Sequence, residues 1–256
     1  MRKVYVIGIG AGDPEQLTLQ AVRVLGGLDA VFVIDKGTAK DELVELRREI
    51  CARHTRPGCR MITAPDPERN RGAADYTGAV VDWYVERAAV FEGMIAGELG
   101  PDGVAGILVW GDPALYDSTL RVLGLVLDRG GVDFAYEVVP GITSVQALAA
   151  AHRVTLTGVG APVHVTTGRR LETGMPAGLD DVLVMLDGKA TFTRLPDSDV
   201  DIYWGAYLGM PDEILISGDL QHRKAEIARV RAEARERKGW IMDTYLLHRR
   251  KPPADA

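Results

Sequence analysis

The sequence has little cysteine, no long apolar run and no excess of positive charge. Its two cysteines, Cys51 and Cys59, form no CxxC motif, so neither a zinc site nor a disulfide framework is expected, and a reducing cytoplasm is the predicted location. No apolar run approaches the about 18 residues of a membrane-spanning helix, and the opening MRKVYVIGIGAGD is too short in apolar residues for a signal peptide. The formal net charge of -6 argues against nucleic-acid binding. These features predict a protein without a membrane or nucleic-acid partner.

Glycine, in contrast, is abundant, with 29 residues in a chain of 256. Strand-like and helix-like segments alternate in the first half of the chain, whereas strands with short connectors dominate the second half. Alternation is typical of a parallel sheet with right-handed crossovers, and runs of strands are typical of an α+β fold. The sequence therefore predicts an α/β protein with two domains. A parallel-sheet N-terminal domain is expected over residues 1–140, and a mixed-sheet α+β domain over 141–256.

Hydrophobic periodicity and capping residues predict the individual elements. Strands are predicted at Val4–Ile9, Ala30–Ile34, Gly103–Trp110, Phe134–Val139, Val163–Thr167, Asp181–Leu186, Val200–Trp204, Glu213–Ser217 and Trp240–His248. Helices are predicted at Pro14–Leu28, Lys40–Ala52, Asp75–Leu99, Tyr116–Asp128, Thr143–Ala151 and Gln221–Lys238, and a loop at Ala64–Asp75. Asp13 and Gln16 are expected to cap the first helix with a capping box.

Three glycine loops follow predicted strands, namely GIGAGD (8–13), GDPALY (111–116) and VPGITS (139–144). Ligands of open parallel sheets bind outside the carboxyl ends of the strands, so the three loops are expected on one rim. The first loop is close to a dinucleotide-binding fingerprint, but Asp13 stands where the third glycine is required, and its carboxylate would repel a pyrophosphate. Neither a nucleophile–His–Asp set nor a P-loop lysine is present. The rim therefore favours an uncharged or zwitterionic cofactor.

The strings GIGAGDPEQLT, LVWGDPALYDS and VPGITSVQALAAAHRVTLTG, in this order and spacing, resemble the tetrapyrrole methylases of cobalamin and sirohaem biosynthesis. The resemblance implies S-adenosylmethionine bound between two domains, S-adenosylhomocysteine as a product, no metal, an anionic tetrapyrrole substrate and a homodimer. The strings TTGRRL, VMLDG, IYWGAYLGMPDEILISGDL and GWIMDTYLL are similar to those of the members that methylate precorrin-5 at C-1 and release acetate. Two alternatives remain open: a methylase acting at another ring carbon, or a non-catalytic S-adenosylmethionine- or tetrapyrrole-binding protein.

The resemblance also implies cofactor contacts at eight positions of this chain. Ala11 stands where the family has a proline, and a steric, main-chain contact tolerates this exchange. Asp187 stands where a methionine is common, with Met185 two residues earlier, and Leu208 is expected to contact the cofactor through its main chain. The full set is Ala11, Gly111, Asp112, Leu115, Thr143, Ser144, Asp187 and Leu208.

Three residues are candidates for the chemistry, because acetate release requires a base that activates water. Asp35 follows a strand at the position of a base proposed for related methylases, although it could instead pair with Lys36. Tyr116 and Asp117 are expected to begin the helix after the GDP loop, where Asp117 could also be a first-turn acid. His152 is expected to interact with a helix C-terminus and not to be catalytic.

Arginines are expected to bind the substrate's carboxylates. Arg169 and Arg170 follow a strand end, which suits bidentate carboxylate recognition. A second basic stretch contacts the substrate or forms a solvated face; it comprises Arg47, Arg48, Arg53, Arg56 and Arg60. The charged helix over 221–238 is predicted to be solvated, with Glu233 and Arg237 paired at i,i+4.

Overall fold

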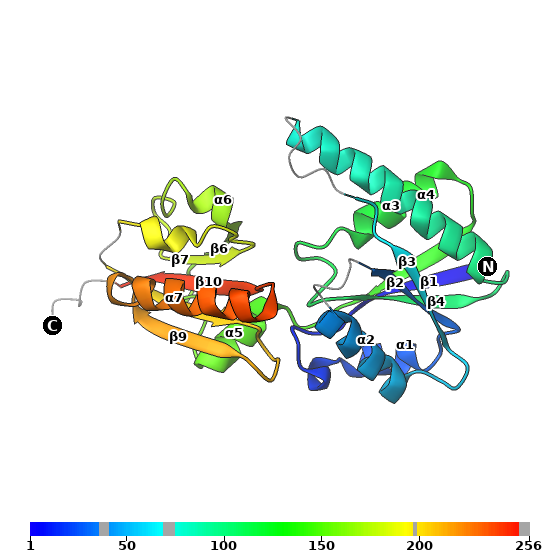
Figure 1. The fold of residues 1–256 in the computed structure, drawn as a ribbon, viewed down its shortest axis with the longest axis horizontal. Coiled ribbons are helices and arrows are strands. Elements are labelled where there is room, and N and C mark those ends of the chain that lie inside the picture. Colours follow the sequence, from blue (N-terminus) through cyan, green and yellow to red (C-terminus); the bar gives the residue numbers. More distant parts are fainter. Residues whose placement is uncertain (36–40, 69–74, 197–198, 251–256) are drawn as a thin grey trace. The chain divides into compact units, whose positions relative to one another are not determined.

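The computed structural model describes residues 1–35, 41–68, 75–196 and 199–250 (Figure 1). The chain forms two compact units, Met1–Thr143 and Ser144–Ala256. The sequence analysis placed the division after residue 140.

The N-terminal unit contains a five-stranded parallel sheet in the order β3-β2-β4-β1-β5. Its strands are β1 (Arg2–Gly8), β2 (Ala30–Asp35), β3 (Arg60–Pro65), β4 (Val104–Val109) and β5 (Phe134–Val139). The sequence did not predict β3, an edge strand in which no residue is fully buried. This segment, RMITAP, lacks the continuous apolar run that predicts a buried strand.

Helices cover both faces of this sheet (Figure 1). They are α1 (Leu19–Leu25), α2 (Asp41–His54), α3 (Tyr76–Glu98) and α4 (Thr119–Arg129). Helices α1 and α2 lie on one face, where they pack on a cluster that includes Ile7 and Ile50; α3 and α4 lie on the other, over a cluster that includes Val6 and Phe91. The neighbours Val6 and Ile7 belong to different clusters because successive side chains of a strand point to opposite faces.

The first helix begins later than predicted. Pro14–Gln16 forms only a 3₁₀ turn (η1) capped by the Asp13 side chain, and α1 begins after Thr18, whose Oγ1 accepts the N–H of Ala21 in the first turn. The predicted capping box is also wrong, because Gln16 Oε1 accepts the N–H of Ala11 at 2.7 Å. The side chain that was expected to cap the helix therefore stabilises the glycine loop that precedes it.

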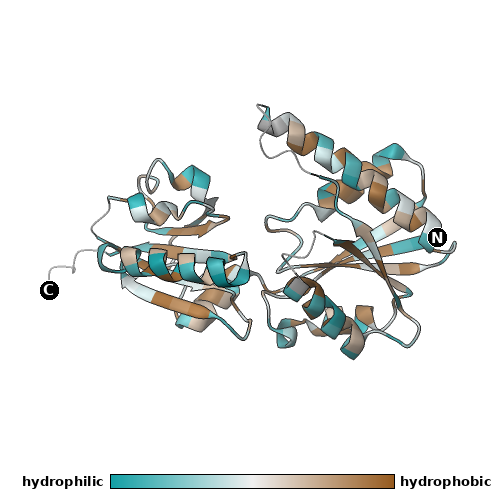
Figure 2. Cartoon of the chain, viewed as in Figure 1, coloured by the Kyte–Doolittle hydropathy of each residue, from teal (hydrophilic) through white to brown (hydrophobic). Residues whose placement is uncertain are grey.

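The C-terminal unit contains a mixed sheet in the order β6-β7-β10-β8-β9. Its strands are β6 (Val163–Thr167), β7 (Asp181–Met185), β8 (Val200–Ala206), β9 (Ile214–Asp219) and β10 (Asp243–Arg249), and its helices are α5 (Ser144–His152), α6 (Gly168–Leu171), η3 (Thr191–Arg194) and α7 (Leu220–Lys238). Only β6 and β7 run parallel. Hydrophobic residues concentrate in the strands, whereas the visible side of α7 is mostly hydrophilic (Figure 2). The parallel and mixed sheets confirm the predicted fold class.

Most predicted elements of this unit are confirmed, and α7 is a good example. It ends at Gly239 in a left-handed conformation (φ 76°), and the Gly239 N–H donates to Arg235 O at 2.8 Å. The short elements α6 and η3 were not predicted. No helix of the described residues is long and apolar enough to cross a membrane.

Candidate functional site

Four glycines bring three loops into backbone contact at the carboxyl ends of β1, β4 and β5. The Gly111 N–H donates to Gly10 O at 2.7 Å, and these two residues form an isolated antiparallel bridge. A Cβ on Gly8 would lie 2.6 Å from Gly141 N, and one on Gly141 would collide with Gly111 O. We call Gly8, Gly10, Gly111 and Gly141 the glycine junction. At Gly8 and Gly141 the backbone-to-backbone packing admits only a residue without a side chain.

The Asp112 side chain joins two of these loops. Its Oδ1 accepts the N–H of Ala114 at 2.7 Å, and its Oδ2 accepts the N–H of Gly141 at 2.8 Å. The carboxylate therefore links the loop after β4 to the loop after β5. The other expected cofactor residues of this unit surround this link: Ala11 is buried beside the bridged Gly10, and Leu115 is half-buried, with its N–H on Asp112 O at 3.2 Å.

Thr143 and Ser144 follow the third loop directly. Both are half-buried, and Ser144 is the first residue of α5. The predicted hydroxyl-bearing segment therefore lies two residues beyond the glycine junction, at the position where the chain passes from one unit to the next.

Tyr116 and Asp117 lie before α4, so the prediction that they begin this helix is wrong. Tyr116 has a left-handed backbone (φ 54°), which cannot be part of a right-handed helix, and its side chain is 46% exposed. Burial of part of the ring raises the pKa of its phenol. Asp117 Oδ1 accepts the N–H of Thr119 at 2.6 Å. A bulky residue in a strained, exposed conformation at a ligand rim is a functional candidate.

The basic stretch on α2 and after it divides into two kinds of arginine. Arg47 is half-buried, and its guanidinium donates to Leu108 O at 3.2 Å and to Leu43 O at 2.7 Å. Burial lowers the pKa of Arg47, and nearby Asp117 opposes this effect. The other four form ion pairs: Arg48–Glu45, Arg53–Glu49, Arg56–Asp29 and Arg60–Glu98. These four fit the solvated face, whereas Arg47 belongs beside β4 and Asp117.

Asp35 is the last residue of β2, and it is exposed. Its main-chain oxygen accepts the N–H of Asp66 at 2.8 Å. The pairing of β2 with β4 ends at Phe32, three residues before Asp35, whereas β2 stays paired with β3 as far as Asp35. Its alternative partner, Lys36, lies outside the described residues. The role of Asp35 as a base stays a prediction.

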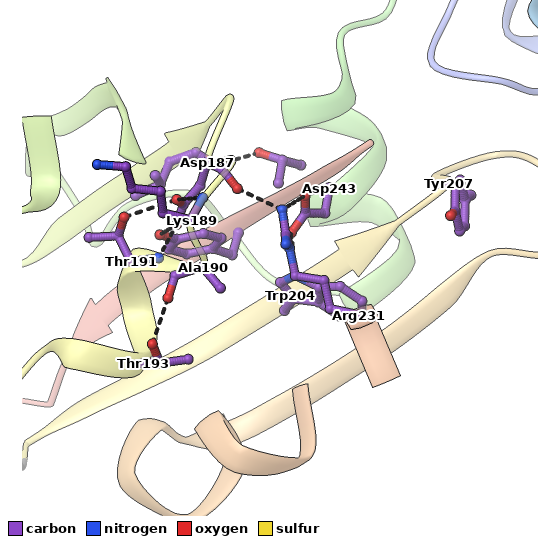
Figure 3. Close-up of polar contacts among 12 residues, drawn as sticks. Asp187, Lys189, Ala190, Thr191, Thr193, Trp204, Tyr207, Arg231 and Asp243 are labelled. Carbon is purple, nitrogen blue, oxygen red and sulfur yellow. Dashed lines mark hydrogen bonds and ion pairs between the residues drawn. The ribbon is translucent and has the colours of Figure 1, made fainter. Parts of the chain in front are cut away.

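The Asp187 carboxylate is buried, with 4% of the residue exposed, and it accepts four hydrogen bonds (Figure 3). Oδ1 accepts from the Lys189 N–H at 3.1 Å and the Thr191 hydroxyl at 2.9 Å; Oδ2 accepts from the Thr191 N–H at 2.6 Å and the Tyr245 hydroxyl at 2.7 Å. An ionised carboxylate offers about four acceptor positions, so this side chain is fully used by the fold.

A buried ion pair supports the same segment from α7. Arg231 is 8% exposed; it donates to Asp187 O at 2.7 Å and to Asp243 Oδ2 at 2.9 Å (Figure 3). Asp243 also accepts the Trp204 indole N–H at 2.9 Å. Burial raises the pKa of Asp243, and the Arg231 guanidinium opposes this shift. The prediction of a solvated α7 is therefore wrong at Arg231, because its partners come from other elements.

Further along α7, the side chain of Glu233 pairs with Arg229 at 2.9 Å, and not with Arg237 as expected. Glu233 has one arginine four residues before it and another four residues after it, and both are within reach on a helix. The sequence spacing alone therefore does not indicate which of the two forms the ion pair.

Leu186, between β7 and Asp187, was not singled out from the sequence. It has a left-handed backbone (φ 54°), and 65% of it is exposed, although it is a large apolar residue. Asp187 fixes the chain immediately after it. The sequence shows only a leucine between the end of a strand and an Asp–Gly pair, and this pattern is too common to indicate a binding site.

Leu208 is 4% exposed and packs beside Gly205, where a Cβ would lie 2.7 Å from Leu208 Cδ2. The preceding Tyr207 is left-handed (φ 52°), and its hydroxyl donates to Trp240 O at 2.7 Å. This anchoring fixes the main chain at Leu208. His152 Nε2 lies 3.0 Å from Trp204 O, within the packing of α5 on the sheet.

Arg169 and Arg170 lie in α6, and both are exposed. Arg170 lines a pocket of the C-terminal unit, and Arg169 is not among the residues that line it. Within the described parts of the chain, no group of three or more His, Cys, Asp or Glu residues is placed to hold a metal ion. Cys51 and Cys59 are free thiols.

Comparisons with known proteins agree with this arrangement. The family model of the tetrapyrrole (corrin/porphyrin) methylases matches residues 3–223. A precorrin-6A synthase [deacetylating] of Sinorhizobium sp is 49% identical over 250 residues, covering 97% of this chain and 96% of that protein. A putative cobalamin synthesis related protein (CobF) of Corynebacterium diphtheriae has a similar structure, with a TM-score of 0.85 and 36% identity over 97% of this chain and 99% of that chain.

The fold is also found in a uroporphyrin-III C-methyltransferase of Thermus thermophilus, solved in complex with S-adenosyl homocysteine. Its TM-score is 0.54 at 20% identity, over 96% of this chain and 97% of that chain.

Proposed function

The chain belongs to the tetrapyrrole (corrin/porphyrin) methylases, and we propose that it is an S-adenosylmethionine-dependent C-methyltransferase that acts on precorrin-5. It methylates C-1 and releases acetate, which gives precorrin-6A in cobalamin biosynthesis. The observation that carries this proposal is the 49% identity to a deacetylating precorrin-6A synthase over 97% of the chain and 96% of that protein.

The residues at the glycine junction fit S-adenosylmethionine, a zwitterion attached to an adenosine. At Gly8 and Gly141 the junction leaves no room for side chains, and glycine allows the main chain to approach a ligand closely, as such a cofactor requires. Leu115 and Tyr116 offer apolar surface nearby, and Thr143 and Ser144 carry hydroxyls. When bound, the cofactor supplies an electrophilic methyl group on a sulfonium.

In the C-terminal unit we assign the apolar cofactor contact to Leu186 in place of Asp187. The Asp187 carboxylate is occupied by four hydrogen bonds, whereas Leu186 presents an exposed apolar side chain at the end of β7. Leu208 keeps its proposed main-chain contact, because Tyr207 fixes the backbone there.

Methyl transfer requires mainly that the chain aligns the ring carbon with the methyl group and excludes water. The methyl group gained by C-1 leaves the macrocycle with one positive charge. Water then adds to the acetyl carbonyl, the bond between this carbonyl and the ring breaks, and its electron pair neutralises the macrocycle while acetate and protons leave. Asp35 is the proposed base for this water, with Asp117 and Tyr116 as the other polar groups of the rim.

The product made from purified precorrin-5 and S-adenosylmethionine tests the proposal by mass spectrometry. A gain of one methyl group with loss of the acetyl group supports it. A methyl gain alone indicates a methylase acting at a different carbon. Cofactor binding without any product indicates a non-catalytic binding protein.

We also propose that the protein is a cytoplasmic homodimer that binds its tetrapyrrole as a polyanion. Sedimentation equilibrium of the full chain checks the assembly, and a monomer at micromolar concentration contradicts it.

A further inference from the structure

One pocket of the C-terminal unit contains Arg170, one of the two arginines that the sequence predicts to bind substrate carboxylates. It has a volume of about 390 Å³ and is lined by residues of β6, α6 and the segment after α6: His164, Thr166, Arg170, Leu171, Gly174 and Pro176. His164 and Thr166 lie on the same face of β6, because alternate residues of a strand point to the same side. Leu171 is buried, so the pocket combines an apolar base with three polar side chains.

The charge of this pocket favours an anion. None of its lining residues is acidic. The Arg170 guanidinium has no hydrogen-bond or ion-pair partner within the described ranges, whereas Arg194, Arg229 and Arg249 of the same unit pair with carboxylates. An arginine fork that lacks an internal carboxylate and lines a pocket is suited to a carboxylate from a ligand.

The pocket is fixed to the segment that carries Leu186. Gly168 begins α6 directly against Asp187, and a Cβ at Gly168 would lie 2.6 Å from Asp187 Cβ. Thr167 pairs with Met185 across the parallel strands. Arg170 therefore lies two residues after Gly168, which packs on the buried Asp187. The strand before it, β6, is the neighbour of β7, which leads to the proposed cofactor contact at Leu186.

We propose that this pocket binds one carboxylate arm of the substrate macrocycle, with Arg170 pairing the carboxylate and Thr166 and His164 donating or accepting hydrogen bonds beside it. The proposal rests on the proposed function, which supplies a substrate with several carboxylate arms. The volume lies at the lower end of the about 300–1,000 Å³ of small-molecule pockets, which suits an acetate or propionate arm and not the whole macrocycle. The pocket thus orients the ring relative to the cofactor.

The first test uses the full chain and glutarate, a small dicarboxylate, as the probe. The chain has five histidines, so NMR resolves few ring signals, and His164→Asn identifies the one in the pocket. Glutarate should shift the His164 signal saturably in the wild type, and Arg170→Ala should weaken this binding about tenfold or more, because the charge-assisted hydrogen bonds of the guanidinium are lost. Arg229→Ala, which removes the same charge from an exposed pair on α7, should keep the wild-type affinity. A His164 signal that does not move, or equal affinity in Arg170→Ala, overturns the proposal.

The second test uses turnover of precorrin-5. Arg170→Ala should raise KM about tenfold or more and leave kcat and the Kd for S-adenosylmethionine within twofold, because the arm is bound equally before and during methyl transfer. Arg170→Lys keeps the charge but loses the forked guanidinium, so its KM should lie between those of the wild type and Arg170→Ala. A fall in kcat with unchanged KM overturns the proposal. If the wild type does not turn over precorrin-5, the proposed function fails, and the glutarate titration still tests the pocket.

Discussion

Asp112 Oδ2 accepts the N–H of Gly141 at 2.8 Å, across 29 residues of sequence. The two residues follow β4 and β5, the strands on either side of β1, so this bond spans the rim of the sheet above β1. It holds the second glycine loop against the third, while the bridge between Gly10 and Gly111 holds the first against the second. The three loops therefore form one connected rim in which each loop depends on the others.

We expect Asp112→Ala to weaken S-adenosylmethionine binding about tenfold or more through the loop geometry. The change leaves two backbone N–H groups, those of Ala114 and Gly141, without their acceptor, which also costs about 1–3 kcal/mol of stability. Calorimetry for the cofactor and urea unfolding measure the two effects. Asp112→Asn keeps one acceptor oxygen and should be intermediate in both. Unchanged cofactor affinity in a folded Asp112→Ala protein contradicts the assignment, and saturable NADH binding would revive the dinucleotide interpretation.

The glycine junction predicts that Gly141→Ala destabilises the protein by about 1–3 kcal/mol, the usual cost of overpacking. The new Cβ would meet the backbone of Gly8 and Gly111, which cannot move aside as a side chain could. Gly124→Ala is the matched control, because a Cβ on this residue of α4 meets nothing within 4 Å. The control should be neutral or stabilising by up to about 1 kcal/mol, since alanine is the better helix former. Equal urea midpoints for the two variants would show that the backbone around Gly141 accommodates a Cβ, which contradicts the prediction.

Leu186 and Asp187 are neighbours with opposite expected phenotypes. Leu186→Ala should weaken S-adenosylmethionine binding about tenfold, because burying a leucine side chain is worth about 1.5–3 kcal/mol, and should change stability by less than about 0.5 kcal/mol. Asp187→Asn should cost about 1–3 kcal/mol of stability, because an amide cannot accept all four hydrogen bonds of the carboxylate. Calorimetry and denaturant unfolding separate the two. If the Leu186→Ala protein binds S-adenosylmethionine with wild-type affinity, Leu186 does not make this contact and another residue does.

Asp35→Asn should slow acetate release more than methyl transfer. The substitution keeps the shape of the side chain and removes a base, which is typically worth about 10²–10⁴-fold, whereas methyl transfer depends mainly on alignment. A single-turnover assay that follows acetate and S-adenosylhomocysteine together should show a methylated, still acetylated intermediate accumulating. If both products appear at wild-type rates, Asp35 is a strand-end acid, and Asp117→Asn becomes the next variant to test.

The sequence by itself determined the fold class, most elements and the order of the three glycine loops. A strand such as Val200–Trp204 is predicted directly, because buried and half-buried residues alternate along it and this alternation imposes a local period on the residue types. The position of Gly239 after a charged helix likewise follows from the left-handed ending that glycine permits. These features depend on neighbours in the chain, which the sequence displays.

Only the tertiary structure decided what the polar side chains do. Asp112 and Asp187 were both expected to contact the cofactor, yet their carboxylates accept hydrogen bonds from their own loops and, at Gly141 and Tyr245, from distant segments. In the sequence, Arg231 cannot be distinguished from the other arginines of a solvated helix, and only the structure shows that it pairs with Asp243. A buried charge requires a partner, and the partner comes from whichever element packs against it, so no local pattern identifies it. Helical and strand periods are written into the sequence, whereas the pairing of charges is set by the packing of elements that lie far apart in it.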